Sequence, residues 1–135
     1  MSQENVEIVR AALDAYNRGD LEAMLKHAAP DLEFDWSRSV SPQKGVYNLD
    51  QFPDFTLAGM FESVRTEPEE LIDAGEHVIT PLIGYFRSRD GLEVTARFTY
   101  LWTFRDGACV RVTIFQARNE ALEAAGWSEN SITDG

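Results

Sequence analysis

The sequence changes from a helical to a strand pattern near Val64, and this change constrains the fold more than any other feature. From there to residue 116 the apolar residues stand in short runs typical of strands. Asp90-Gly91 and Asp106-Gly107 mark hairpin turns between these runs. We predict strands over residues 64–75, 77–89, 92–104 and 108–116. Strands joined by such turns pair antiparallel, so this half of the chain predicts an antiparallel sheet.

The first part of the chain carries a helical pattern instead. Val6, Val9, Leu13 and Tyr16 follow one another at three- and four-residue steps, as on one face of an amphipathic helix. Such a face needs an apolar surface to cover it, and the predicted sheet supplies one. Helices ahead of antiparallel strands therefore predict an α+β fold in which the helices cover one face of the sheet.

The remaining elements follow from caps and breaks in the pattern. Gly19 is expected to end the first helix, and Asp20 to cap a second helix that ends at Pro30. Further elements are expected in three places: a short strand over LEFDW at 32–36, a third helix at about 48–63 and a last helix at 118–127.

Length and charge limit the classes of function. At 135 residues the chain has the length of a single domain, 1–135. Twelve basic residues against 23 acidic ones give a net charge of −11, which repels phosphate backbones and argues against nucleic acid as a partner. No apolar run is long enough to span a bilayer, and the N-terminus lacks the pattern of a signal peptide. We expect no membrane partner and a cytoplasmic location.

No residue pattern predicts a metal or a cofactor. A single cysteine, Cys109, excludes an internal disulfide and a cysteine-based zinc site. His27 is expected near a helix end and His77 at a strand start, and neither belongs to a metal-ligand spacing. We therefore expect neither a metal nor a cofactor.

The turn between the last two predicted strands decides which side chains point inward. A two-residue turn at Asp106-Gly107 would place Arg111 opposite Trp102 and separate the apolar residues of the two strands. A three-residue turn over 105–107 would pair Phe104 with Ala108, and we adopt it because the apolar residues then share one face. The inward set under this register is Phe98, Tyr100, Trp102, Val110, Val112, Ile114 and Gln116.

Two side chains outside this hairpin bear on the interior. A two-residue turn at Asp90-Gly91 would place Tyr85 beside Ala96, facing inward. Asp35 stands between Phe34 and Trp36, and a carboxylate among aromatic residues would be a candidate general base. Strand side chains alternate, however, so the apolar neighbours should face the core and Asp35 the opposite side unless a bulge intervenes.

The order of elements resembles the nuclear transport factor 2-like superfamily, and within it the SnoaL-like group of polyketide cyclases and ketosteroid isomerase relatives. The match is carried by RGDLEAMLKHAAPDLEFDWS at 18–37, LWTFRDGACVRV at 101–112 and NEALEAAGW at 119–127. The resemblance implies a cystatin-like α+β barrel. In it a curved antiparallel sheet wraps around the N-terminal helices to form a cone-shaped pocket, commonly in a dimer.

The resemblance also bears on chemistry. Ketosteroid isomerases use an aspartate base with a tyrosine and an aspartic acid as oxyanion donors. Counted along this sequence, the base position falls on Trp36, the tyrosine position on Ala12 and the aspartic acid position on Tyr100. The isomerase triad is therefore absent, and only Tyr100 could still donate a hydrogen bond.

These observations leave two functions open. One is a cofactor-independent cyclase, isomerase or dehydratase acting on an apolar or aromatic small molecule, with Tyr100 or Tyr16 as proton donor. The other is a non-catalytic ligand-binding or scaffold module, which needs only the pocket. A core of aromatic residues without a pocket is a further interpretation of the same pattern. The predicted pocket residues are Trp36, Tyr85, Phe98, Trp102 and Gln116.

A homodimer is expected through the outer face of the sheet. Thr99, Leu101, Thr113 and Phe115 fall on the face opposite to the predicted pocket. A monomer should not expose a large apolar patch of this kind, so we expect a second copy to cover it.

Overall fold

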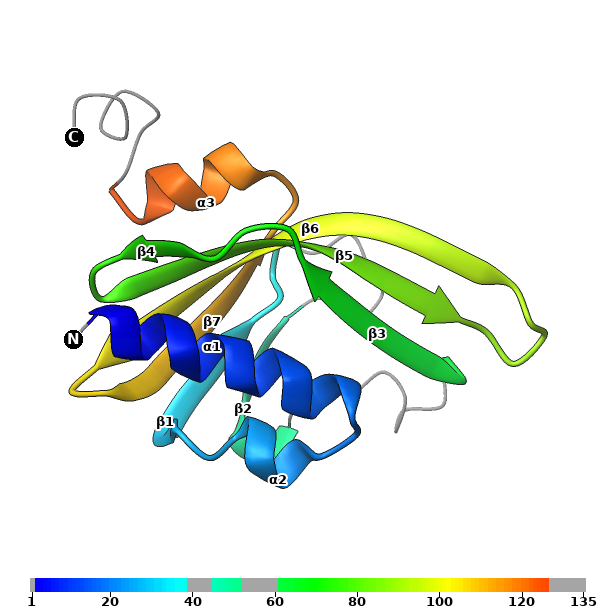
Figure 1. Ribbon diagram of the computed structural model, residues 1–135, viewed down its shortest axis with the longest axis horizontal. Helices are drawn as coiled ribbons and strands as arrows, with labels where there is room; N and C mark the ends of the chain where they lie inside the picture. The colour runs from blue at the N-terminus through cyan, green and yellow to red at the C-terminus, as the bar shows by residue number, and fades with distance from the viewer. Residues whose placement is uncertain (1, 39–44, 52–60, 127–135) are drawn as a thin grey trace.

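The computed structural model describes residues 2–38, 45–51 and 61–126 (Figure 1). Its helices are α1 (Ser2–Asn17), α2 (Leu21–Met24) and α3 (Arg118–Ala124), with a 3-10 helix η1 (Leu49–Gln51). Its strands are β1 (Ala28–Asp35), β2 (Val46–Asn48), β3 (Ser63–Pro68), β4 (Ile72–Ala74), β5 (His77–Arg87), β6 (Glu93–Arg105) and β7 (Ala108–Phe115). The α+β class predicted from the sequence is confirmed.

The first helix ends and the second begins as predicted, but the second is short. α1 ends before Gly19, which has a φ of +76° that glycine adopts without strain. The carboxylate of Asp20 then accepts a hydrogen bond from the backbone N–H of Ala23 at 3.0 Å and caps α2. The predicted end at Pro30 is wrong, since Pro30 lies inside β1 where the pairing with β7 is irregular.

One curved sheet holds all the strands, in the order β2-β1-β7-β6-β5-β3, with β4 paired to β5 beside β3. Five of the strand pairs are antiparallel, but β1 pairs with β7 in parallel. The strands between residues 63 and 115 pair antiparallel as predicted, and the parallel pairing of β1 with β7 makes the whole sheet mixed rather than purely antiparallel. The long run 64–75 divides into β3 and β4. β2 and η1 occupy the start of the predicted third helix, most of which lies outside the described residues.

The β6–β7 hairpin keeps most of the predicted inward face through a different turn, but Cys109 rather than Val110 lines a cavity on that face. Arg105 pairs with Ala108 across a two-residue turn in which Asp106 has a φ of 54° and Gly107 a φ of 81°. Two positive φ values in succession are those of a type I′ turn. The register then shifts between Thr103 and Phe104. This bulge restores the parity, so Trp102 faces Val112 and Tyr100 faces Ile114.

The sheet has a core on each face. On the face that α1 covers, Val9 and Leu13 pack with Leu32, Phe34 and Trp36 and with inward residues of β5 and β7. α3 lies on the other side of the sheet (Figure 1), where Ala121 and Leu122 pack against Ile79, Leu101 and Phe115. None of the described helices combines the length and apolarity that a membrane crossing needs.

This second core removes the basis of the predicted dimer. Thr99, Leu101, Thr113 and Phe115 are all buried within one chain, and α3 packs on Leu101 and Phe115. The expectation that a monomer exposes these residues is therefore wrong. The last helix was predicted, but its packing onto the outer face was not.

Candidate functional site

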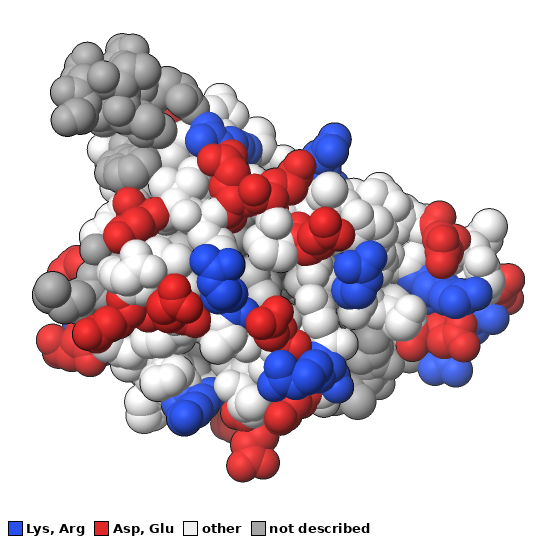
Figure 2. Space-filling model, in the orientation of Figure 1, with Lys and Arg blue, Asp and Glu red and all other residues white. Residues whose placement is uncertain are grey.

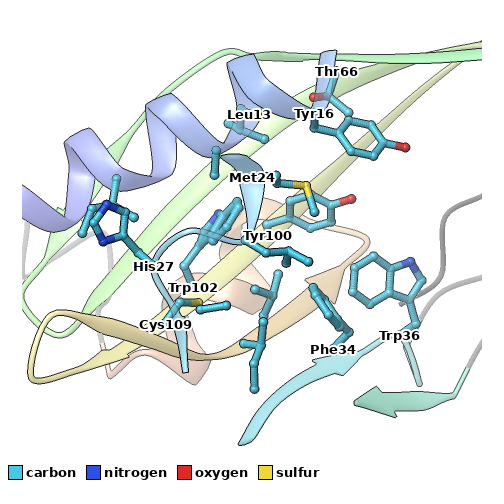
Figure 3. Close-up of a pocket in the computed structure, with 16 residues that line it drawn as sticks. Leu13, Tyr16, Met24, His27, Phe34, Trp36, Thr66, Tyr100, Trp102 and Cys109 are labelled. Atoms are coloured by element: carbon cyan, nitrogen blue, oxygen red, sulfur yellow. The ribbon is translucent and has the colours of Figure 1, made fainter. Parts of the chain in front are cut away.

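A cavity of about 70 Å³ lies between α1 and the concave face of the sheet (Figure 3). α1 and the residues following it form one wall, and β1, β3, β6 and β7 form the others. Most of the lining is apolar. The lining residues are Ile8, Ala12, Leu13, Tyr16, Met24, Leu25, His27, Ala28, Leu32, Phe34, Trp36, Thr66, Tyr100, Trp102, Cys109 and Val112.

Aromatic rings make up one continuous side of the cavity. The ring of Tyr100 lies 5.7 Å from that of Trp36 and 6.0 Å from that of Trp102, measured between centroids. Phe34 meets Trp36 edge to face at 5.7 Å. The indole N–H of Trp102 donates to Thr80 Oγ1 at 3.0 Å, which holds this ring in place. Such a wall suits a flat apolar ligand.

Two tyrosine hydroxyls supply polar groups at one end of the cavity. Tyr16 comes from α1 and Tyr100 from β6, and in Figure 3 both hydroxyls point toward the end where Trp36 lies, away from Trp102 and His27. Burial raises the pKa of Tyr100 far above its ordinary value, and the neighbouring Tyr16 raises it further. Tyr100 therefore stays a neutral phenol, which can donate a hydrogen bond but does not act as a base.

Thr66 contributes a further polar position, and Asn17 fixes it. The carboxamide of Asn17, the last residue of α1, donates to the backbone carbonyl of Thr66 at 2.7 Å and accepts from its N–H at 2.9 Å. The side chain thus bonds β3 as a neighbouring strand would. α1 and β3 are held together at the level of the cavity.

His27 and Cys109 lie at the other end of the cavity (Figure 3). The backbone N–H of Cys109 donates to the carbonyl of His27 at 2.8 Å, which ties the start of β7 to the residue before β1. Burial raises the pKa of the Cys109 thiol to about 12, so the thiol stays protonated near neutral pH and is a poor nucleophile. His27 was predicted to lie near a helix end. His27 does follow closely after the end of α2 at Met24, and the residue, although exposed to solvent, also lines the cavity, which was not predicted.

Asp35 lies on the opposite face of β1, as strand alternation predicts. Its carboxylate accepts hydrogen bonds from the N–H of Ser37 at 3.0 Å, from the Ser37 hydroxyl, and from Arg111 Nη2 at 2.6 Å. Arg111 also binds Glu33. Burial would raise the pKa of Asp35, but the hydrogen bonds from Ser37 and Arg111 outweigh it and hold the pKa below 3.8. Asp35 is thus an ion-pair partner beside Trp36, not a base inside the cavity.

The cavity brings together Tyr16, Trp36, Tyr100 and Trp102 of the residues proposed from the sequence. Tyr85 is not among them. The loop after β5 is longer than the predicted two-residue turn, which shifts the β5–β6 register so that Tyr85 pairs with Thr95 and not with Ala96. Its ring lies under the guanidinium of Arg65 at 4.3 Å, on the outer face.

Gln116 and Phe98 also lie outside the cavity lining. Gln116 follows the end of β7, where the chain turns toward α3, and its amide donates to the carbonyl of Arg38 at 3.3 Å. Because Gln116 lies outside the strand, the alternation of side chains along β7 does not decide where its side chain points. Phe98 faces inward as predicted, but it lies two residues before Tyr100 on β6 and outside the cavity lining. Its ring is 5.4 Å from the Tyr100 ring.

Charge and metal-binding groups play little part in the site. No group of three or more His, Cys, Asp or Glu side chains is placed to hold a metal ion within residues 2–38, 45–51 and 61–126. The face seen in Figure 2 mixes acidic and basic side chains rather than concentrating one sign. Aromatic rings and a few hydroxyl groups are the main features of the cavity lining instead.

The sequence matches a family of known domains over most of its length. Residues 9–112 match the SnoaL-like domain, a span that contains almost the whole cavity lining. The chain belongs to the SnoaL-like family. No curated protein matches this sequence.

Solved structures share the SnoaL-like fold at low sequence identity. TerC, co-crystallised with polyporic acid, superposes with a TM-score of 0.73 at 22% identity, over 91% of this chain and 98% of that one. An NTF2-like protein of unknown function from Burkholderia pseudomallei gives 0.73 at 24% identity, over 89% and 95%. Delta 5-3-ketosteroid isomerase from Mycobacterium sp. gives 0.67 at 17% identity, over 83% and 92%. These likenesses confirm the cystatin-like, ketosteroid isomerase-like fold.

Proposed function

We propose that this protein binds a small aromatic molecule in the cavity between α1 and the sheet, and that Tyr16 and Tyr100 donate hydrogen bonds to an oxygen of that molecule. The observation that carries the proposal is the pair of tyrosine hydroxyls at one end of an otherwise apolar, aromatic-walled cavity. Apolar pockets with a few placed polar groups are the usual form of small-molecule sites. TerC, which shares the fold and was co-crystallised with polyporic acid, supports a small-molecule ligand for this chain as well.

The size of the cavity restricts how a ligand enters. An apolar cavity of roughly 150 Å³ holds benzene, whereas this one measures about 70 Å³. A bound ring must therefore displace part of the lining. Met24 is the lining side chain best suited to move, because it is half-buried, unbranched and at the end of the short helix α2.

The chemistry that fits this site is hydrogen-bond donation to a carbonyl oxygen. A neutral tyrosine beside a developing enolate would stabilise its negative charge, as cofactor-independent cyclisation, isomerisation and dehydration require. A catalytic cycle also needs a proton acceptor. No carboxylate belongs to the described lining, and His27, at the end of the cavity away from the two hydroxyls, is the lining side chain whose chemistry suits a general base.

A non-catalytic binding module is the second candidate function. The apolar lining, which contains no Asp or Glu among the described residues, favours it, because binding needs no base. The two candidates are separated by His27→Gln. This variant should abolish turnover of an enolisable ketone if His27 is a base, and should change only affinity if the protein merely binds.

The binding proposal is tested by titration calorimetry with acetophenone, a single aromatic ring that carries a carbonyl. Tyr100→Phe removes one hydroxyl donor and is expected to weaken binding by about three- to tenfold. Trp36→Ala removes part of the ring wall and should weaken it at least as much. Tyr85→Phe is the matched control, because it removes a tyrosine hydroxyl from the outer face. Binding that is equally strong in all the variants would place the ligand elsewhere.

Assembly as a homodimer stays a prediction. The outer face over Leu101 and Phe115 is covered by α3, so a dimer would need other contacts. The large hydrophobic side chains that the described residues expose are Val46, Leu92 and Val94. Light scattering at micromolar concentration would show whether the protein has the mass of one chain or of two.

A further inference from the structure

Aromatic ring contacts continue beyond the cavity along the β5–β6 hairpin. Phe98 lies two residues before Tyr100 on β6, with its ring 5.4 Å away. Phe86 on β5 lies 6.4 Å from Phe98, and Phe61 lies 5.1 Å from Phe86. We call Phe61, Phe86 and Phe98 the aromatic shelf. An unbroken series of ring contacts thus leads from the shelf through Tyr100 to Trp36.

The shelf is accessible and apolar. All three of its rings are half-buried, whereas Trp36 inside the cavity is 5% exposed. Phe86 pairs with Val94, which is 56% exposed, so the apolar surface extends to the outer part of the hairpin. Figure 1 shows this hairpin reaching past the body of the molecule.

Gly84 gives the shelf its shape. Gly84 lies between Leu82 and Phe86 on the inner face of β5, opposite Ala96. A Cβ atom at this position would lie 2.7 Å from a carbon of the Phe86 ring and 2.8 Å from a carbon of the Phe98 ring. Both rings therefore lie over the backbone where a side chain would stand. Any residue other than glycine would push them away.

We propose that the aromatic shelf is a second subsite, and that the ligand of this protein is an elongated molecule with at least two aromatic groups. The proposal rests on the binding function proposed above. One ring enters the cavity, a carbonyl or hydroxyl oxygen meets Tyr16 and Tyr100, and a second aromatic group stacks on Phe98 and Phe86. The tyrosine hydroxyls support this order, because they point toward the Trp36 end of the cavity, and Phe98 lies on the side of Tyr100 opposite to Trp102.

The cavity volume favours an extended ligand over a compact one. At about 70 Å³ the cavity alone is too small to enclose a molecule of several rings. A ligand that leaves its second ring on the shelf needs less displacement of the lining. It also covers apolar surface of Phe86 and Phe98 that a folded monomer otherwise leaves partly in water.

The test compares two probes, acetophenone and flavone, by titration calorimetry. Flavone carries a carbonyl and an additional phenyl group that acetophenone lacks. Phe98→Leu keeps an apolar side chain but removes the ring. It is expected to weaken flavone binding by about tenfold and to leave acetophenone binding unchanged. Gly84→Ala should act in the same direction by displacing both rings. Leu92→Ser is the control, on the same hairpin but 68% exposed and away from the shelf.

Phe61→Leu is a second variant in case Phe98→Leu does not fold, because Phe61 lies before β3 and outside any strand. Equal loss of both probes in these variants, or no loss of either, would overturn the subsite while leaving the cavity proposal intact. Failure of both probes to bind the unmodified protein would overturn both proposals. A change in light-scattering mass without a change in flavone affinity would identify the shelf as a contact between two copies of the chain, and so would also overturn the subsite.

Discussion

At the scale of single residues, Asp35 shows how a carboxylate beside the cavity contributes to stability. Its pKa lies below the ordinary 3.8 in the folded protein. The unfolded chain therefore takes up the proton first as the pH falls. The stabilisation is complete well above pH 3.8 and is lost as the pH falls through the lower folded-state value.

We expect Asp35→Asn to reduce the fall of the melting temperature between about pH 5 and about pH 2, measured by calorimetry in a pH series. Glu33→Gln is the control. Glu33 binds the same guanidinium, but its side chain is 52% exposed, and such pairs contribute about 0–1 kcal/mol. If the melting temperature falls as steeply with pH in Asp35→Asn as in the parent protein, other carboxylates cause the loss of stability in acid.

The pKa of Tyr100 is shifted upward, whereas that of Asp35 is shifted downward, and the effect is expected at high pH. Its raised pKa keeps the phenol protonated where an ordinary tyrosine, with a pKa of about 10, ionises. Tyr100→Phe should therefore leave the phenolate absorbance gained between about pH 7 and about pH 11 unchanged, as long as the protein stays folded. If this substitution removes the signal of one tyrosine, Tyr100 is open to water and the neutral-donor role is wrong.

At the scale of elements, the contact between α1 and β3 depends on one side chain. Asn17→Ala would leave the N–H and the carbonyl of buried Thr66 without their partner. The expected cost is about 1–3 kcal/mol in the free energy of unfolding, measured with urea. Asn17→Asp keeps the acceptor and loses the donor, so its free energy of unfolding should lie between those of the parent protein and Asn17→Ala. Equal stability of all three proteins would mean that water replaces the carboxamide.

The elements also show what the sequence can and cannot predict. The alternation of Leu32, Phe34 and Trp36 was sufficient to place Asp35 on the far face of β1, because one face of that strand is wholly apolar. Hairpin registers were harder. The turn before β6 closes with a hydrogen bond from the N–H of Ser88 to the carbonyl of Leu92, and it shifted Tyr85 to the outer face.

A bulge has no clear sequence signature, and this explains why the turn between β6 and β7 was predicted wrongly. Most of the predicted inward face of β6 and β7 is right although the predicted turn is wrong, because the bulge restores the parity that a two-residue turn alone would invert. Val110 and Gln116 are the exceptions, and neither lines the cavity. His27 was missed as a cavity residue because propensity favours a longer α2, whereas the helix ends after four residues. The sequence therefore predicted the aromatic wall, but not the residues at element ends.

At the scale of the whole molecule, the two cores should be separable by mutation. Leu122 on α3 is 1% exposed and packs on the outer face, away from the cavity. Leu122→Ala is expected to cost about 2–5 kcal/mol in the free energy of unfolding and to leave ligand affinity unchanged. Leu13→Ala removes a cavity-lining side chain at a similar cost, and should alter affinity as well. Loss of affinity in both variants would show that the faces are coupled through the sheet.

The cavity wall has one more consequence, for how occupancy of the site can be observed. Trp36 and Trp102 are two of the three tryptophans in the protein, and both line the cavity. Indole emission shifts in wavelength and intensity when water leaves its surroundings or when another ring stacks on it. A ligand that fills this space must therefore change the intrinsic fluorescence, so the protein reports its own occupancy without a label.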